Sequence, residues 1–366
     1  MKILITGVTG QDGSNMADYL LLNLYKDDPS VIVYGTKRNI SSDEESNYVG
    51  NIKHLKGNER FILVEMDLSD IISISNVIGP IKPDFCINFA AQSLVSTSWN
   101  TPFQTFDINV MGVMRLLEVI KQSCPTCRFY SAGSSEEFGD VSYTPQDIHH
   151  PLKPRSPYGA SKCAARHIVK VYRESYGMYA VHATLFNHEG RRRGEQFVTM
   201  KIAKFFRELR DYFKLNLNLT NECVEQKRLL VPKMGIGNIY AERDWSDSED
   251  FIVAVWKMLN MPKPREYLIS SGTSHTVKEF IDLAAKCAKI DIYGQLVWEG
   301  KGINEKLYLI INNNSNNKYN IVFIDEKYYR LAEVDCVCGD STESRKILDW
   351  EPTVSFEMLV QKMVDG

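Results

Sequence analysis

The stretch Lys2-Ile-Leu-Ile-Thr-Gly-Val-Thr-Gly-Gln-Asp-Gly13 decides the fold of the chain. Its apolar residues Ile3, Leu4 and Ile5 follow one another without the alternation of a half-exposed strand, which is typical of a parallel strand buried on both faces. The glycines that follow have the spacing of a dinucleotide-binding turn, and a helix is predicted to begin near Gln11. The alternative is that the glycines only let this helix pack closely on the strand.

Such a turn can bind a pyrophosphate, because small residues let the backbone approach it and the helix N-terminus offers N–H groups and a positive dipole. The glycines lie between a buried strand and a helix, and this context favours a cofactor site over close packing alone. The predicted cofactor contacts in the turn are Gly7, Thr9, Gly10, Gln11 and Asp12.

Apolar runs of strand length recur along the first half of the chain, with helical segments between them. They lie at Lys2–Thr6, Val31–Thr36, Phe61–Met66, Phe85–Phe89, Arg128–Ser131 and Ala180–Thr184. A second long amphipathic helix is expected at Phe106–Ile120. This alternation predicts an α/β fold, a Rossmann-like doubly wound parallel sheet with helices on both faces.

The regular alternation ends after about Thr184, so a second part of the chain is expected there. The predicted Rossmann domain covers 1–185, and the chain returns to it around 237–260. A smaller C-terminal substrate-binding lobe is expected from 186–236 and 261–366.

Two segments, 215–235 and 307–324, look like insertions in this organisation. The second is predicted to be a hairpin with a polar tip, because two β-like runs flank a run of asparagines. No function is assigned to either.

Composition and charge exclude several classes of function. The 366 residues are 44% hydrophobic and 24% charged with a net charge of −3, which gives no broad attraction for nucleic acid or anionic lipid. There is no run of 18 apolar residues and no leader-like segment. We therefore expect a cytoplasmic protein with neither a nucleic-acid nor a membrane partner.

Eight cysteines are scattered without a framework spacing. Cys124 and Cys127 form a C-x-x-C that could be a redox pair or half of a zinc site, with Cys336 and Cys338 as the other half. Reduced structural thiols are the simpler interpretation, because the second pair has one intervening residue and no His lies beside either pair. No metal is expected.

The end of the second predicted strand selects the cofactor. An NAD site usually has an Asp or Glu there for the ribose 2′-hydroxyl, whereas this chain has Lys37 and Arg38 and no acid before Asp43. Cations at that point match a 2′-phosphate, so NADP is predicted; the alternative is that they belong to a solvated loop. The further predicted cofactor contacts are Asp67 and Leu68 near the adenine, and Ala90 and Ser93 beside the nicotinamide ribose.

Tyr158 and Lys162 are four residues apart, so both side chains project from one face of a predicted helix. A nearby cation favours the ionised form of a phenol, which lets Tyr158 move a proton to or from a hydroxyl. A Y-x-x-x-K can also occur by chance. Here, however, the fifth predicted strand ends in hydroxyls and carboxylates at 131–139, at the edge where open α/β sheets bind ligands.

The glycine turn, the serine-rich strand end and the Tyr158–Lys162 helix together resemble the extended short-chain dehydrogenase/reductase family. Further motifs resemble the GDP-mannose 4,6-dehydratases within it. They lie at Thr9–Ser14, Ala91–Ser93, Ser156–Ala160, Leu185–Glu189, Arg192–Gly194, Phe197–Thr199, Arg243–Trp245, Tyr328–Arg330 and Glu333–Asp335. The likeness runs from the first strand to nearly the last residue, interrupted by the two insertions.

The resemblance implies a lyase that converts GDP-mannose to GDP-4-keto-6-deoxymannose and water by an internal redox cycle on NADP. Tyr158, supported by Lys162 and Ser134, would take the 4-hydroxyl proton as hydride leaves carbon 4. Glu136 would remove the acidified proton of carbon 5 and protonate the departing 6-hydroxyl, before hydride returns to carbon 6. Plain hydride transfer needs no carboxylate at position 136, so Glu136 separates elimination from reduction.

The resemblance also implies binding residues. His188 and Arg193 would contact the cofactor, and the sugar and GDP pocket would be lined by Ser93, Ser135, Asn187, Lys201, Arg243, Arg330 and Glu333. Ser135 stands where glucose-type dehydratases have an Asp, which favours the mannose type. Surface salt bridges are the alternative role for the cations.

Several residues depart from the family pattern. Ser134 replaces a Thr, Leu94 and Asp247 replace His, Arg191 replaces a Pro, and Glu137 and Phe138 replace Leu and Tyr. None removes a catalytic group, but Leu94 and Asp247 put fine substrate contacts in question.

Rival functions are another nucleotide-sugar 4,6-dehydratase, an epimerase or a GDP-4-keto-6-deoxymannose reductase of the same fold, or a non-catalytic NADP-sensing protein. The resemblance implies a homodimer or homotetramer.

Overall fold

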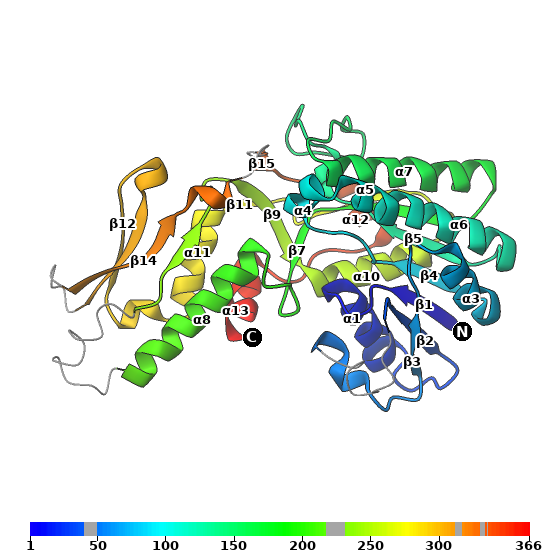
Figure 1. Ribbon diagram of the computed structural model, residues 1–366, viewed down its shortest axis with the longest axis horizontal. Coiled ribbons are helices and arrows are strands. Elements are labelled where there is room, and N and C mark those ends of the chain that lie inside the picture. The colour runs from blue at the N-terminus through cyan, green and yellow to red at the C-terminus, as the bar shows by residue number, and fades with distance from the viewer. Residues whose placement is uncertain (40–49, 217–230, 312–316, 330–333, 335) are drawn as a thin grey trace. The chain divides into compact units, whose positions relative to one another are not determined.

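The computed structural model describes residues 1–39, 50–216, 231–311, 317–329, 334 and 336–366. The chain forms two compact units (Figure 1). The first contains Met1–His188, Asp244–Thr273 and Val337–Thr353, and the second contains Glu189–Arg243, Ser274–Cys336 and Val354–Gly366. The predicted assignment of cofactor to one part and substrate to the other stays a prediction.

The first unit is built on a seven-stranded sheet. Its strands are β1 (Lys2–Thr6), β2 (Ile32–Lys37), β3 (Phe61–Glu65), β4 (Phe85–Asn88), β5 (Arg128–Ala132), β6 (Ala180–Leu185) and β10 (Glu266–Ile269). They lie in the order β10-β6-β5-β4-β1-β2-β3, and every neighbouring pair is parallel. The order reverses between β1 and β4, which is the doubly wound arrangement that the sequence predicts.

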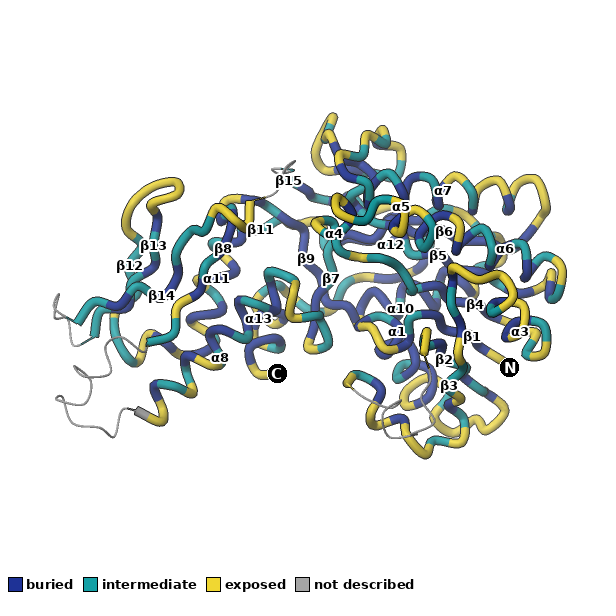
Figure 2. Tube along the Cα trace, viewed as in Figure 1, coloured by how far each residue is buried: buried dark blue, intermediate teal, exposed yellow. Residues whose placement is uncertain are grey.

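Helices cover both faces of this sheet (Figure 1). They are α1 (Gln11–Asp18), α3 (Ile71–Ile81), α4 (Val95–Asn100), α5 (Pro102–Phe106), α6 (Gly112–Ser123), α7 (Pro157–Ser175), α10 (Ser248–Leu259) and α12 (Thr342–Leu348). Ile3 and Ile5 pack into a core with α1 and α10, whereas Leu4 packs into a second core with α3, α6 and α7. The unbroken apolar run of β1 is explained by this burial on both faces, which Figure 2 shows along the central strands.

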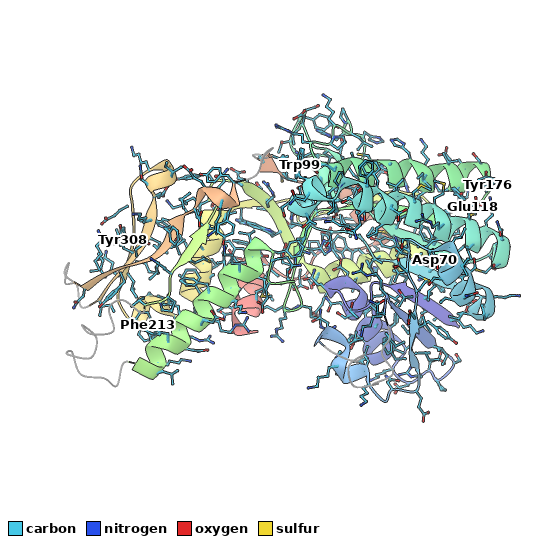
Figure 3. All side chains as sticks on the ribbon, viewed as in Figure 1. Asp70, Trp99, Glu118, Tyr176, Phe213 and Tyr308 are labelled. Atoms are coloured by element: carbon cyan, nitrogen blue, oxygen red, sulfur yellow. The ribbon has the colours of Figure 1, made fainter. Side chains whose placement is uncertain are left out.

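Polar side chains fix where several of these helices begin. The Asp70 carboxylate accepts a hydrogen bond from the Ile72 N–H at the start of α3 (Figure 3). Asp247, which stands where the family pattern has a His, caps α10 through the Glu249 N–H at 2.7 Å. Side-chain oxygens satisfy N–H groups that have no partner within the helix, which favours these residue types at these positions.

The second unit combines three helices with a small sheet. The helices are α8 (Val198–Asn216), α11 (Val277–Cys287) and α13 (Phe356–Asp365), and they pack on one another. The sheet has the order β12-β13-β14-β8, with β12 (Gln295–Glu299), β13 (Lys306–Ile310), β14 (Lys318–Ile324) and β8 (Met234–Ile236). A third sheet is formed by β7 (Asn187–Glu189), β9 (Glu242–Asp247), β11 (Ser274–Thr276) and β15 (Cys336–Val337).

The predicted fold class is confirmed, and the six predicted strands begin and end within one residue of those observed. The predicted hairpin is formed by antiparallel β13 and β14, although its tip at 312–316 lies outside the described residues. The boundaries differ, because the chain returns to the first unit at Asp244–Thr273 and again at Val337–Thr353, whereas the prediction has one return around 237–260. The first return includes β10, at the edge of the large sheet. β10 lies outside the regular alternation of strands and helices from which the other six strands are predicted, so the pattern gives no signal for it.

Among the helices of the described chain, none combines the length and the apolar character needed to cross a membrane. No group of three His, Cys, Asp or Glu side chains in the described residues is arranged to hold a metal ion. Cys124 and Cys127 are free thiols.

Candidate active site

The glycine turn leaves no room for side chains. Gly7 has a φ of +66°, and a Cβ there would lie 2.9 Å from the Ala90 backbone. A Cβ on Gly13 would lie 2.4 Å from the Gly7 carbonyl oxygen, so the first turn of α1 sits directly on the loop. The turn is closed by a hydrogen bond from the Gly10 N–H to the Gly7 carbonyl at 3.0 Å. This close approach of backbone to backbone is what a pyrophosphate-binding turn requires.

Polar residues at the start of α1 meet a segment far along the chain. The Asp12 carboxylate lies 3.0 Å from Nε2 of His188, and the Gln11 amide donates to the His188 carbonyl at 3.1 Å. Nδ1 of His188 lies 2.8 Å from the Phe186 carbonyl, which fixes the ring orientation. The predicted cofactor residues Gln11, Asp12 and His188 are therefore brought together.

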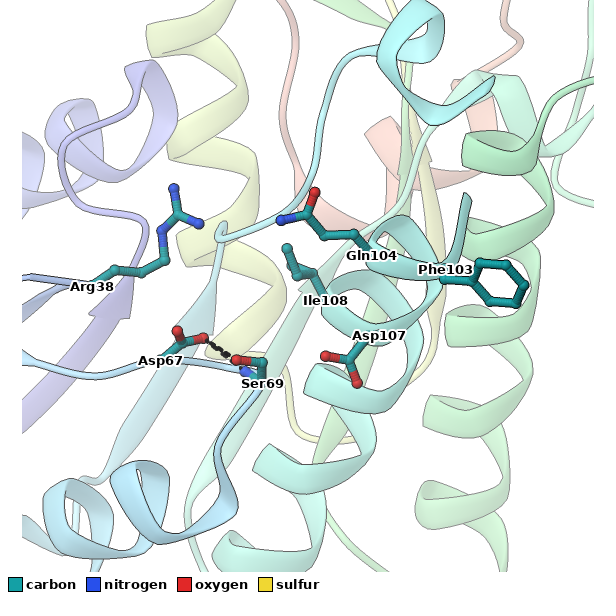
Figure 4. A pocket seen from close by; sticks show the side chains of 7 residues that line it. All are labelled: Arg38, Asp67, Ser69, Phe103, Gln104, Asp107 and Ile108. Carbon is teal, nitrogen blue, oxygen red and sulfur yellow. Dashed lines mark hydrogen bonds between the residues drawn. The ribbon is translucent and has the colours of Figure 1, made fainter. Parts of the chain in front are cut away.

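The carboxyl ends of β2 and β3 border a cavity of about 400 Å³ (Figure 4). Its lining residues are Arg38, Asp67, Ser69, Phe103, Gln104, Asp107 and Ile108. Hydrogen bonds from Ser69 hold the pKa of the Asp67 carboxyl below its ordinary value, with a smaller contribution from Arg38. Lys37 is not one of the lining residues. The sequence offers Lys37 and Arg38 equally for a 2′-phosphate, whereas the structure places Arg38 at the cavity and Lys37 outside its lining.

The far wall of this cavity was not predicted. Gln104 and Ile108 come from α5 and the π turn Asp107–Met111 that follows it. Arg115 pairs with Asp107 at 2.7 Å and donates to the Leu68 carbonyl at 3.0 Å, which fixes the chain after β3. The amphipathic pattern predicts that this segment is helical. It does not predict that one turn of the segment lines a cavity.

The loop after β4 is held by a buried amide. Asn109 exchanges hydrogen bonds with the Gln92 backbone at 2.9 and 3.0 Å and donates to Oγ of Ser161 on α7 at 3.0 Å. On the other side, Thr6 accepts from the Ala90 N–H at 3.0 Å. Ala90 is half-buried and Ser93 is exposed at this edge of the sheet. Asn109 gave no signal in the sequence, because a single polar residue in a helix usually faces solvent.

The turn after β5 carries the carboxylates. A 3-10 helix at Ser135–Glu137 begins with a reciprocal cap: Oγ of Ser134 accepts from the Glu136 N–H at 3.3 Å, and Glu137 accepts from the Ser134 N–H at 2.8 Å. Glu136 is half-buried, whereas Ser135 is buried. This double cap fixes the backbone on both sides of Glu136.

Helix α7 packs tightly on that turn. A Cβ on Gly159 would lie 2.4 Å from the Glu136 carbonyl oxygen, so the residue after Tyr158 touches the carboxylate-bearing turn. The Lys162 ammonium lies 5.7 Å from the centre of the Tyr158 ring and donates to the Ala132 carbonyl at 2.8 Å. Burial lowers the pKa of Lys162 to about 8, and the charges of Glu137 and Asp12 oppose that shift.

The remaining predicted residues divide between the units and the undescribed chain. In the first unit, Asn187 is half-buried in β7. In the second, Arg193 pairs with Glu189 at 2.9 Å, Lys201 donates to the Gly235 carbonyl at 2.7 Å and Arg243 donates to the Val334 carbonyl at 2.7 Å. Arg330 and Glu333 lie outside the described residues.

Comparison with known proteins adds a family. The family described as GDP-mannose 4,6 dehydratase matches residues 4–363. The GDP-mannose 4,6-dehydratase of Vibrio cholerae is 37% identical over 99% of this chain and 92% of its own length. The human GDP-mannose 4,6 dehydratase is also 37% identical, over 99% of this chain and 90% of its own length.

Solved structures show the same fold at low identity. A dTDP-glucose 4,6-dehydratase of Streptomyces venezuelae with NAD and TYD bound has a TM-score of 0.75 at 19% identity, covering 100% of this chain and 96% of its own. RMD of Pseudomonas aeruginosa, complexed with NADPH, has a TM-score of 0.70 at 20% identity, covering 100% and 97%. The doubly wound sheet thus agrees with these structures. The family itself is identified by the match over residues 4–363 and by the relatives that are 37% identical over nearly the whole chain. The chain belongs to the GDP-mannose 4,6-dehydratase family.

Proposed function

We propose that the chain converts GDP-mannose to GDP-4-keto-6-deoxymannose and water, with NADP as a cofactor that is regenerated in each cycle. The observation that carries this proposal is the packing of the Tyr158–Lys162 helix on the turn that bears Glu136, through the close contact at Gly159. This packing supports the proposal, because Tyr158 and Lys162 would act as a proton-transfer pair beside the separate carboxylate of Glu136. A simple reductase needs only the proton-transfer pair and no separate carboxylate.

The residues of the first unit fit a nicotinamide dinucleotide. Gly7, Gly10 and Gly13 let the turn fold tightly against the N-terminus of α1, where a pyrophosphate is stabilised. The cavity beyond β2 and β3 would hold the adenosine, with Arg38 supplying the positive charge that a 2′-phosphate needs. When bound, the nicotinamide supplies a reversible acceptor for the hydrogen on carbon 4.

The chain's own residues then move the protons. Tyr158 takes the proton of the 4-hydroxyl, and the Lys162 ammonium near its ring favours the phenolate. With carbon 4 oxidised to a ketone, the hydrogen on carbon 5 is acidic enough for Glu136 to remove. Glu136 then returns that proton to the departing 6-hydroxyl, which leaves as water. The double bond between carbons 5 and 6 that remains would take back at carbon 6 the hydrogen removed from carbon 4, and would take at carbon 5 a proton, for which protonated Tyr158 is the donor that restores its starting state. Ser134 would hydrogen-bond the reacting oxygen while its Oγ also fixes the Glu136 N–H.

The sugar and GDP are proposed to contact Ser93, Ser135, Asn187, Lys201, Arg243, Arg330 and Glu333, with His188 and Arg193 beside the cofactor. Guanidinium and ammonium groups suit a diphosphate, because charge-assisted hydrogen bonds to phosphate are the stronger kind. Lys201 also lies 3.5 Å from the centre of the Tyr328 ring, which places an aromatic face beside a cation in the second unit.

We also propose a homo-oligomer. Its support is a set of exposed apolar side chains on α4, α5 and the π turn: Trp99, Phe103, Phe106 and Met111, of which Phe103 is 90% exposed. Exposed apolar side chains on neighbouring turns favour association. Light scattering on the parent protein, with Phe103→Asp as a weakened variant, measures the assembly.

The test of the proposed activity is Glu136→Gln. The amide keeps the shape of the side chain but cannot act as a base, so water elimination from GDP-mannose should fall by about 10²-fold or more while NADP and GDP-mannose still bind. Asp140→Asn is the matched control, because Asp140 is an exposed carboxylate on the same segment that pairs with Arg155. If mass spectrometry shows that Glu136→Gln forms the dehydrated product at the parent rate, the assignment of the base is wrong.

A further inference from the structure

Glu137 carries a second carboxylate next to Glu136 that the proposed chemistry does not use. Its side chain is 0% exposed. Oε1 accepts from the Ser134 N–H at 2.8 Å and lies 3.1 Å from Nε2 of His182. Oε2 lies 3.5 Å from the Thr184 hydroxyl and 3.6 Å from the Arg166 guanidinium. A buried charge is strongly destabilising unless it is paired in this way, so the arrangement demands that all these partners stay in place.

The catalytic turn lies directly on this pair. A Cβ on Gly133 would be 2.4 Å from Nε2 of His182 and 2.5 Å from Oε1 of Glu137, so the turn has no space to move toward them. The bond from the Ser134 N–H to Glu137 holds one end of the turn, and the bond from the Glu136 N–H to Ser134 holds the other. The position of the buried carboxylate therefore determines the position of the Ser134 and Glu136 backbone.

Charged and titratable side chains on α7 and β10 lie around the pair. From α7, Arg166 binds Glu266 of β10 at 2.8 Å and Arg173 binds the same carboxylate at 3.2 Å. The Cys163 thiol donates to the Glu137 carbonyl at 3.4 Å, and burial raises its pKa to about 12, so it stays neutral. Because an ionised carboxylate only accepts, Nε2 of His182 carries the proton that faces Glu137.

The ammonium of Lys162 is anchored to the same stretch of chain as Glu137: it donates to the Ala132 carbonyl at 2.8 Å, two residues before the Ser134 N–H that Glu137 binds, and the neighbouring Cys163 contacts the Glu137 carbonyl. Burial is the largest influence on the pKa of Lys162 and lowers it to about 8, while the negative charges of Glu137 and Asp12 oppose the shift. Burial alone would raise the pKa of the Glu137 carboxyl, but His182, Arg166 and the Ser134 N–H outweigh it and the pKa is lowered. Glu137 is therefore charged at neutral pH and can stabilise the nearby cation.

We propose that Glu137, paired with His182 and Arg166, is a positioning residue that holds the Ser134–Glu136 turn in place and keeps the buried ammonium of Lys162 charged beside Tyr158. The role is separate from that of Glu136, because Glu137 is enclosed and cannot reach a substrate. It rests on the proposed dehydratase activity, since a site without that chemistry needs neither the turn nor the ammonium. The Leu expected here from the family pattern could supply neither the bond nor the charge.

The test is the pH profile of kcat for water elimination in Glu137→Gln. Losing the negative charge should lower the pKa of Lys162 below its value of about 8, so activity at pH 8 should fall several-fold beyond any loss seen at pH 6. The KM for GDP-mannose should stay unchanged. A merely structural role would lower activity by the same factor at every pH and would leave the profile in place.

Two further variants separate charge from position. Glu137→Asp keeps the charge but shortens the reach to the Ser134 N–H, so kcat should fall at every pH while the profile stays at the parent position. Glu266→Gln removes a carboxylate of the same network that pairs with Arg166 and Arg173 and is not among the charges acting on Lys162, so it should lower stability without moving the profile. If Glu137→Gln does not fold, the double variant Glu137→Leu and Phe138→Tyr is used instead. It removes the same charge and introduces the two side chains that the family pattern has at these positions.

The proposal is overturned if the parent eliminates water from GDP-mannose and the profile of either charge-removing variant coincides with that of the parent. A parent that binds NADP but eliminates no water contradicts the proposed function instead. The two failures are therefore distinguishable in one set of measurements.

Discussion

Replacing Arg38 by Ala tests how the cavity beyond β2 and β3 selects its cofactor. The charged residues among those lining the cavity are Arg38, Asp67 and Asp107, and Asp107 is already paired with Arg115. Without Arg38 the lining is acidic and would repel a 2′-phosphate. A charge-assisted hydrogen bond contributes about 1.5–3 kcal/mol, and because Arg38 is exposed we take the low end, about a tenfold loss of NADPH affinity.

Fluorescence titration of parent and variant with NADPH and with NADH measures this effect. We expect the dissociation constant for NADPH to rise about tenfold while that for NADH stays the same, because only NADPH carries the 2′-phosphate. Lys37→Ala is the matched control: Lys37 lies one residue earlier, at the end of β2, and does not line the cavity, so it should change selectivity less.

Two results would show that Arg38 does not select NADP through its 2′-phosphate. If Arg38→Ala weakens NADPH and NADH by the same factor, Arg38 contacts a part common to both cofactors. If the parent itself binds both equally, the cavity does not read the 2′-phosphate and the predicted preference for NADP is wrong.

Two further predictions concern the glycine turn and the buried pair. Gly13→Ala should reduce the free energy of unfolding by about 1–3 kcal/mol and weaken cofactor binding, because its Cβ would lie 2.4 Å from the Gly7 oxygen. Gly10→Ala is the control and should lose less stability, because its Cβ would lie 3.3 Å from the same atom. Equal midpoints of urea denaturation for the two variants would contradict this steric explanation. Glu137 has a lowered pKa when folded, so its charge stabilises the fold above the ordinary value of 4.5 and that stability is lost as pH falls through the lowered value. The stability deficit of Glu137→Gln should therefore shrink from about pH 6 to pH 3 in urea denaturation, and a constant deficit would show that the charge contributes nothing.

The sequence predicts the part of the fold that depends on burial. Strands such as β1 that are covered on both faces must be apolar throughout, so their positions can be read from the residues alone. β10 could not be found in this way, because it lies at the edge of the sheet and outside the regular alternation of strands and helices in the first half of the chain. Its place depends on contacts with β6 that are distant in sequence.

The candidate site was predictable where a spacing reflects local geometry. The glycine turn and the pair Tyr158 and Lys162 belong to this class, since one turn of chain determines both. Asn109 and Glu137 do not, because each acquires its contacts only when α7 and β6 pack against it. The sequence could show that Glu137 departs from a pattern, but not that its carboxylate is buried against an imidazole.

The proposed cycle eliminates water through oxidation and reduction within one sugar. GDP-mannose carrying deuterium at carbon 4 tests it most directly, by incubation with the parent protein and a catalytic amount of NADP, followed by mass and NMR analysis of the product. We expect a product lighter by one water, with the deuterium now at carbon 6. A product that has lost the deuterium to solvent, or that forms only as NADP is consumed, would contradict the account.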